Sequence, residues 1–347
     1  PPPPPPPPPP TITHPPTPYT STMVSSSAAS DVYKRQVSHR IAALLARAEQ
    51  GENLDVDDTE QLFMARGRDF DAVCDAADRM RAAQCGDAVS YVVNRNINYT
   101  NICSFRCAFC AFAKGRKRTE ASDAPYLKGP EEVARLAVEA WESGATEVCL
   151  QGGIHPSFTG ETYLEILRAV RSAVPLIHIH AFSPLEVTHG ARSLGMELED
   201  YLRLLAEAGL RTLPGTAAEI LSDDVRDIIC PDKINTSEWL GVLETAHGLG
   251  LQTTATIRFG HVDRYSHWAI LLQRVLELQR RTGGITEFVP LPFVAEEAPI
   301  YRRGQARRGP TFREAVLMHA VARLTLGRDI PNIQASWVKM GLEGAAF

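Results

Sequence analysis

The sequence has no long apolar run. No stretch approaches the ~20 consecutive apolar residues that a membrane-spanning helix needs. It has no excess of basic residues either, because 36 Lys and Arg stand against 41 Asp and Glu and give a formal net charge of -5, a balance that does not favour nucleic-acid binding. The first 36 residues lack the basic start and apolar centre of a secretory signal. We therefore expect a soluble, cytoplasmic protein with no membrane and no nucleic acid among its partners.

Cysteine is scarce and odd in number. Seven cysteines in 347 residues suit a reducing compartment better than a disulfide framework. Four of them stand in apolar or helical surroundings and are expected to be buried small side chains: Cys74, Cys85, Cys149 and Cys230. The other three need a different explanation, because they are close neighbours in the sequence.

Cys103, Cys107 and Cys110 lie within eight residues at the spacing C-x3-C-x2-C. Thiolate sulfur is the ligand that selects iron-sulfur clusters or zinc. A closed zinc site or an electron-transfer cluster normally uses four protein ligands, whereas this loop supplies three and would leave one iron of a [4Fe-4S] cluster open to a small molecule. Two alternatives remain, namely a zinc site completed by a distant histidine and three buried small side chains.

Three segments follow one another along the chain. Residues 1–36 begin with ten prolines and have no helical or strand period, so we expect a disordered low-complexity segment; its last residues, 31–36, are interpreted as a cloning or assembly scar. Residues 37–85 have apolar positions at helical spacing and predict a helical lead-in, with helices from Val37 and near 57–65 and 69–83. Residues 86–347 are expected to form one main domain.

The main domain alternates strand-like and helix-like segments. Strands are expected near 89–98, 146–150, 176–181, 210–214, 253–259, 287–291 and 332–337, and helices near 130–144, 160–173, 198–208, 237–250, 267–283 and 311–326. Such alternation is typical of βα units on a parallel sheet. It predicts an α/β fold of the TIM-like (β/α)8 barrel type, in which only seven strands are visible and the last strand is missing.

In such barrels the active site lies at the carboxyl ends of the strands. Glycine and polar residues follow the expected strands in this sequence, and they should therefore meet at one mouth together with the cysteine loop. The residues selected on this basis are Gln151, Gly152, Gly153, His180, Ser183, Glu219, His261 and Gln334. Of these, His180, His261 and Gln334 are the candidates for lining a substrate pocket.

Several of these residues admit a simpler explanation. Gly152 and Gly153 could only form a tight turn from strand to helix. His178 and His180 share one face of a strand, where a hydrogen-bonded core histidine is the commoner case, and His180 is favoured as a pocket residue because it lies at the strand's end. Glu219 could bond ribose hydroxyls, or it could be a first-turn helix charge. The basic run at 116–118 is most simply a solvated face, although it could attract an anionic electron donor.

Phe109 stands just before the third cysteine, so the loop has the form C-x3-C-x-aromatic-C. This form resembles the radical S-adenosylmethionine superfamily. The resemblance implies that S-adenosylmethionine chelates the open iron, that an electron from the cluster releases a 5'-deoxyadenosyl radical, that Phe109 lies beside the adenine, and that the Gly152-Gly153 backbone approaches the methionine amino group. The cofactor-binding candidates are Phe109, Gln151, Gly152, Gly153, Ser183 and Glu219.

Longer strings narrow the resemblance to the 4-hydroxybenzyl-transferring subunit of deazaflavin (Fo) synthase. The resemblance covers essentially residues 37 to 347, and the strings that carry it are residues 94–98, 103–112, 150–156, 178–184, 214–221, 259–262, 286–293 and 333–339. Aminofutalosine synthase and dehypoxanthine futalosine cyclase of menaquinone synthesis share several of these strings and stay as the alternative. Three strings favour the deazaflavin enzyme: 214–219, 230–236 and 287–294.

The resemblance implies that L-tyrosine loses its side chain, as a 4-hydroxybenzyl unit, to 5-amino-6-(D-ribitylamino)uracil. It implies a second radical S-adenosylmethionine subunit or fused domain that closes the deazaflavin ring, and a reductant such as flavodoxin or ferredoxin. Family members continue beyond the strand expected at 332–337, so the barrel of this chain is expected to be truncated. A third hypothesis, from another class, is a non-catalytic iron-sulfur or zinc-binding barrel.

Overall fold

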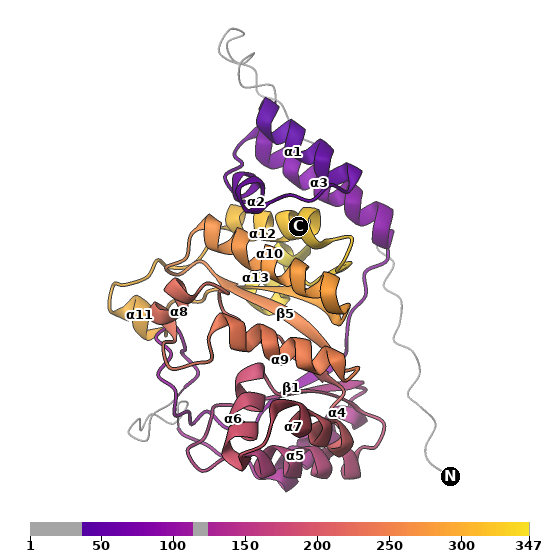
Figure 1. Ribbon diagram of the computed structural model, residues 1–347, viewed down its shortest axis with the longest axis vertical. Helices are drawn as coiled ribbons and strands as arrows, with labels where there is room; N and C mark the ends of the chain where they lie inside the picture. The colour runs from indigo at the N-terminus through magenta and orange to yellow at the C-terminus, as the bar shows by residue number, and fades with distance from the viewer. Residues whose placement is uncertain (1–36, 114–123, 347) are drawn as a thin grey trace.

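The computed structural model describes residues 37–113 and 124–346 (Figure 1). The proline-rich segment 1–36 and the basic run 116–118 lie outside the described residues, so the predictions for them stay predictions. None of the described helices is long and apolar enough to cross a membrane.

Three helices precede the sheet, as the lead-in predicted: α1 (His39–Gln50), α2 (Val56–Phe63) and α3 (Arg68–Cys85). The Ser38 side chain accepts a hydrogen bond from the Ile41 amide and so caps the start of α1. The apolar faces of these helices pack against α10 (Tyr265–Thr282) and α12 (Phe312–Leu326), on the side of the sheet that lies uppermost in Figure 1.

Seven parallel strands form one sheet in the order β1-β2-β3-β4-β5-β6-β7. Their bounds are β1 (Asn94–Asn98), β2 (Glu147–Gln151), β3 (His178–Ala181), β4 (Thr212–Leu213), β5 (Gln252–Phe259), β6 (Ile285–Pro292) and β7 (Asn332–Ile333). Each strand pairs with the next along the chain, so the sheet curves as an open half-barrel with β1 and β7 at its edges. The predicted parallel barrel with seven strands is confirmed.

The helices between the strands cover the outer face of this sheet. They include α4 (Pro130–Glu142), α5 (Gly160–Ala173), α7 (Leu198–Ala208) and α9 (Thr236–Gly248), as well as α10 and α12. These six lie where the sequence predicted helices. In β2 the outward-facing Val148 and Leu150 are fully buried, whereas Glu147, Cys149 and Gln151 alternate with them on the inner face. The inner face of the half-barrel therefore carries polar groups, and the apolar core lies between sheet and helices.

Four described helices were not predicted: α6 (Pro184–Leu194), α8 (Asp223–Ile229), α11 (Pro299–Arg302) and α13 (Trp337–Ala346). The signal for α6 was present, because Ser183 and Glu186 form a capping box and Pro184 occupies the first turn. The strand predicted at 332–337 is wrong after residue 333. The amides of Lys339 and Met340 donate to the Ser336 carbonyl, which begins helix α13 instead of extending the ladder to β6.

The prediction for the four isolated cysteines is correct for one of them. Cys230 is 1% exposed, whereas Cys74, Cys85 and Cys149 are only partly buried. Cys74 and Cys85 lie on α3, whose outer side faces solvent, and Cys149 faces the open interior of the half-barrel. All seven cysteines are free thiols.

Candidate active site

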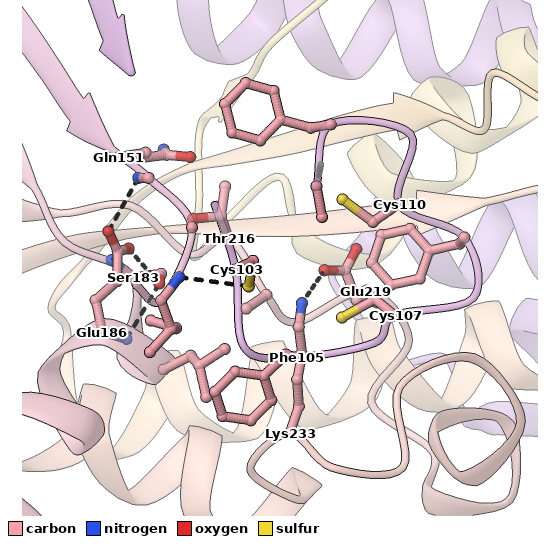
Figure 2. Close-up of a pocket in the computed structure, with 18 of the residues that line it drawn as sticks. Cys103, Phe105, Cys107, Cys110, Gln151, Ser183, Glu186, Thr216, Glu219 and Lys233 are labelled. Atoms are coloured by element: carbon pink, nitrogen blue, oxygen red, sulfur yellow. Dashed lines mark hydrogen bonds and ion pairs between the residues drawn. The ribbon is translucent and has the colours of Figure 1, made fainter. Parts of the chain in front are cut away.

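One cavity of about 250 Å³ lies at the carboxyl ends of the strands. The loop after β1 contributes one wall of it, and the ends of β2, β3, β5 and β6 and the loop after β4 contribute the rest (Figure 2). Nine residues selected from the sequence line it together: Cys103, Cys107, Phe109, Cys110, Gln151, Gly152, Gly153, Ser183 and Glu219. Parallel strands place their carboxyl ends at one edge, which is why segments more than a hundred residues apart meet here.

The three pocket candidates do not line this cavity. His178 and His180 point at the hydroxyl of Thr212, with their ring nitrogens 2.8 and 2.7 Å from its oxygen. Burial lowers the pKa of His180 to about 4, so its imidazole is neutral at pH 7. The commoner role of a hydrogen-bonded histidine on the inner face accounts for both.

His261 and Gln334 lie farther from the cysteine loop. His261 is 2% exposed, with one ring nitrogen 3.1 Å from Asp263 and the other 3.0 Å from the Arg258 carbonyl oxygen. It therefore stabilises the turn behind Arg258 and does not face the cavity. Gln334 is exposed, and its amide donates to the Phe288 carbonyl at the edge of the sheet.

The cysteine loop is bonded directly to the turn that follows β2. The Gly153 amide donates to the Thr100 carbonyl at 2.9 Å, and the Ser104 amide donates to the Ile154 carbonyl at 2.8 Å. Between them, the Ile154 amide lies 3.3 Å from the Cys103 sulfur, which is a contact that thiolates in metal sites commonly accept (Figure 2). The position of Cys103 thus depends on the backbone of residues 152–154.

Both glycines of this turn are needed for close approach. A Cβ on Gly152 would lie 2.2 Å from the Tyr99 ring, and a Cβ on Gly153 would lie 2.3 Å from the Ile102 carbonyl oxygen. Neither gap admits a side chain. The turn is therefore built to lie against the cysteine loop, which is more than a strand-to-helix connection requires.

The environment of the thiols shifts the pKa of two of them. Burial raises the pKa of Cys107 to about 12 and also raises that of Cys103, so these thiols would give up their protons only to a bound metal. Within the described ranges no three His, Cys, Asp or Glu side chains lie close enough to hold one metal ion.

Opposite the thiols, the Glu219 carboxylate forms ion pairs with two cationic side chains. Its carboxylate lies 3.1 Å from the Lys233 ammonium and 2.9 Å from the Arg258 guanidinium. Burial alone would raise the pKa of Glu219, but Lys233 and Arg258 outweigh it and lower this pKa to about 2. Both cations also lie over the Phe109 ring, 5.2 and 5.3 Å from its centroid. Glu219 precedes α8, which begins at Asp223, so it is not a first-turn helix charge. A carboxylate can accept about four hydrogen bonds, and the expected role of Glu219 in ribose binding stays a prediction.

The loop that contains Glu219 has a strained backbone, which a buried arginine side chain stabilises. Ala217 and Glu219 adopt positive φ angles of 65° and 49°, which non-glycine residues rarely do. The Arg226 side chain, 3% exposed, donates to the carbonyl groups of Ala217, Ala218, Ile220 and Ile234. It thereby satisfies carbonyls that this conformation turns inward.

Sequence reasoning missed Lys233, Arg258, Arg226 and Glu186, which complete the site. A signal existed for Arg258, because it lies near the carboxyl end of β5 on the same face as Thr256, and both line the cavity. Another existed for Glu186, in the capping box with Ser183. No local pattern distinguishes Lys233 or Arg226 from surface cations.

The chain is similar in sequence to known proteins over most of its length. The family model of the radical SAM superfamily matches residues 97–273. The chain is 52% identical over 268 residues to the 5-amino-6-(D-ribitylamino)uracil--L-tyrosine 4-hydroxyphenyl transferase of Methanopyrus kandleri, over 77% of this chain and 72% of that relative. It is 50% identical over 305 residues to the FO synthase of Streptomyces coelicolor, over 88% of this chain and 35% of that relative.

The chain thus spans about a third of the length of the FO synthases that it matches. Among solved structures, methylornithine synthase has a TM-score of 0.66 at 17% identity, over 87% of this chain and 82% of that chain. At this identity the likeness concerns the fold alone.

Proposed function

This chain belongs to the radical SAM superfamily, and on that premise we propose that it transfers the 4-hydroxybenzyl group of L-tyrosine to 5-amino-6-(D-ribitylamino)uracil. The main support is that three thiols from one short loop share a cavity with Phe109 and the Gly152-Gly153 turn. The reaction is that of the relatives named as 4-hydroxyphenyl transferases. The domain carrying it would be residues 86–347, preceded by the helical lead-in at 37–85.

Membership of the family implies a [4Fe-4S] cluster and S-adenosylmethionine. Cys103, Cys107 and Cys110 would hold the cluster, and their number would leave one iron for S-adenosylmethionine. Once bound, this pair supplies a 5'-deoxyadenosyl radical through one-electron cleavage of the sulfonium. The chemistry that follows depends on how the chain's own residues orient the ligands and exclude water.

The charges around the cavity suit a zwitterionic amino-acid group. Lys233 and Arg258 share the single carboxylate of Glu219, so this wall has one positive charge in excess. A ligand carboxylate is stabilised there. The Glu186 carboxylate, 2% exposed, lines the same cavity from the β3 side and favours an ammonium group near it. Such a separation of charge orients an α-amino acid before any reaction occurs.

The inner face of the half-barrel offers polar groups to a substrate. Asn98, Gln151 and Thr256 line the cavity from three different strands. Their amide and hydroxyl groups both donate and accept, which suits a uracil ring and its ribityl hydroxyls. The partners that complete the pathway would be a second radical SAM subunit or fused domain and a small reductant such as flavodoxin or ferredoxin.

Anaerobic reconstitution followed by product analysis tests this function. We expect about four irons per chain, deoxyadenosine on reduction, and a 4-hydroxybenzylated pyrimidine from tyrosine and the ribitylaminouracil. Stoichiometric zinc without iron would place the chain among non-catalytic metal-binding proteins. Deoxyadenosine without the benzylated pyrimidine, but with turnover of a menaquinone precursor, would assign it to the aminofutalosine synthase or dehypoxanthine futalosine cyclase type.

A further inference from the structure

Glu186 lies in the first turn of α6 and is 2% exposed. One of its carboxylate oxygens, Oε2, accepts hydrogen bonds from the Ser183 amide at 2.7 Å and from the Ser183 hydroxyl. This half of the side chain completes an ordinary capping box at the start of a helix. A capping box alone leaves the second oxygen free to face solvent.

In Glu186 the second oxygen accepts hydrogen bonds from other parts of the chain. Oε1 accepts hydrogen bonds from the Gly152 amide at 3.1 Å and from the Tyr99 hydroxyl. These donors come from the ends of β2 and β1, whereas Glu186 follows β3. One carboxylate therefore ties together the ends of three adjacent strands, at the edge of the sheet where the cavity lies.

The four hydrogen bonds to Glu186 stabilise an ionised carboxylate. A carboxylate offers about four acceptor sites, and two amides and two hydroxyls occupy them. Burial raises the pKa of Glu186, while hydrogen bonds from Ser183 and Tyr99 oppose that shift. The N-terminus of α6 also favours a negative charge at this position. An amide side chain of the same shape would turn an NH2 group toward one pair of donors.

The turn that Glu186 holds is the one bonded to the cysteine loop. Three consecutive amides of this turn donate hydrogen bonds. The Gly152 amide donates to Glu186, the Gly153 amide to the Thr100 carbonyl and the Ile154 amide to the Cys103 sulfur. Glu186 supplies the only side-chain oxygen among these three acceptors. A shift at residue 152 bears on Cys103, because the next two amides of the same turn bond the cysteine loop.

We propose that Glu186 is a positioning residue, which holds the Gly152-Gly153 turn against the cysteine loop and thereby sets the site for the amino-acid part of S-adenosylmethionine. This inference rests on the proposed function, since it assumes that S-adenosylmethionine is the cofactor of this cavity. Glu186 acts through the turn, and its loss impairs cofactor binding more than folding.

The chain contains a matched control in Glu314, at the start of α12. Glu314 is 5% exposed, completes a capping box with Thr311, and accepts a hydrogen bond from the Tyr265 hydroxyl at 2.9 Å. It resembles Glu186 in position, burial and tyrosine contact, although Arg307 also pairs with it. Glu314 does not line the cavity, so its substitution measures the loss of a buried capping glutamate without any effect on the turn.

The test compares Glu186→Gln, Glu314→Gln and the unmodified chain after anaerobic reconstitution. We expect both variants to lose a similar few degrees of melting temperature and to keep their iron. In Glu186→Gln alone, the Kd for S-adenosylmethionine should rise at least tenfold, and the change that S-adenosylmethionine causes in the electron paramagnetic resonance spectrum of the reduced cluster should disappear at concentrations that saturate the unmodified chain. Glu186→Asp keeps the charge but shortens the side chain, so it can no longer span Ser183 and Gly152. It should show the same loss of binding, which separates the effect of the turn from that of the charge, and it replaces Glu186→Gln if that variant does not fold.

Two results would overturn the inference. An unchanged Kd in the folded Glu186 variant would show that the turn does not depend on this carboxylate. An equal loss of binding in Glu314→Gln would show that general destabilisation is the cause. If instead the unmodified chain carries its cluster but binds no S-adenosylmethionine, the proposed function fails as well, so the two failures are distinguishable.

Discussion

The Lys233 ammonium lies 3.1 Å from the Glu219 carboxylate on the cavity wall that faces the thiols. Lys233 has only 10% of its side chain exposed, and its positive charge opposes the effect of burial on the thiols of Cys107 and Cys103. A charge that favours thiolates also favours an added electron on a cluster that they hold. Lys233 is therefore placed to influence reduction as well as binding.

Replacing Lys233 with Gln should make the cluster harder to reduce. We expect the midpoint potential to fall by roughly 60 mV, which corresponds to a tenfold change in a one-electron equilibrium. Redox titration followed by electron paramagnetic resonance measures it. Arg192→Gln is the control, because Arg192 is 67% exposed and pairs with Glu238 on the surface. A potential that does not differ between the two variants would rule out this role for Lys233.

Replacing Cys110 with Ala should abolish both cluster retention and deoxyadenosine formation. The loop offers the cluster only three thiolates, and the substitution would leave two. Cys230 offers the sharper comparison. It is buried, and its charge would act on that of Cys107, so it is a candidate for a fourth thiolate ligand. Iron analysis of Cys230→Ala should still give about four irons per chain. Loss of iron from Cys230→Ala would instead indicate a closed site with four thiolates.

Replacing Gly153 with Val should weaken S-adenosylmethionine binding at least tenfold, because even its Cβ would lie 2.3 Å from the Ile102 carbonyl oxygen and would displace the cysteine loop. Gly241→Ala is the control. It lies within α9 with nothing within 4 Å of an added Cβ, and should stabilise the fold by up to ~1 kcal/mol. Binding and thermal unfolding are measured on both. If Gly153→Val lowers only the melting temperature, the turn has no part in binding.

Acidification should destabilise the fold through His247. Its ring nitrogens lie 2.7 Å from the Thr282 hydroxyl and 2.9 Å from the Thr253 hydroxyl, and burial lowers its pKa to about 4. Between pH 6.5 and 4 the unfolded chain therefore binds a proton that the native chain does not, so the free energy of unfolding falls as pH falls. Urea unfolding at pH 7.5 and pH 5 should show a smaller loss for His247→Gln than for the unmodified chain. Equal losses would contradict this assignment.

Much of the fold was predictable because its determinants are local. Apolar positions repeat at the helical period in α5, and Val148 and Leu150 alternate with polar residues in β2. The βα alternation then implies a parallel sheet, and a parallel sheet implies that strand ends meet. This is why Gly153, Ser183 and Glu219 could be assigned to one cavity before any contact was known.

Side-chain partners were not predictable in this way. His180 ends a strand but faces the Thr212 hydroxyl instead of the cavity, since the register between β3 and β4 places them together. The strand expected at 332–337 stops after residue 333, and the chain continues into α13. Each outcome depends on the hydrogen-bond partners that a neighbouring strand or helix provides. The local sequence pattern holds no information about those partners.

The sequence by itself determined the ligand loop, because Cys103, Cys107 and Cys110 lie within eight residues and their spacing is a local property. The tertiary structure alone decided which charges surround that loop. Lys233 and Arg258 meet at Glu219 from separate segments, and Glu186, which follows β3, reaches Gly152 at the end of the neighbouring strand β2. The physical reason is that a buried charge is tolerated only where partners converge on it, and that convergence is created by the packing of strand ends that are distant in the sequence.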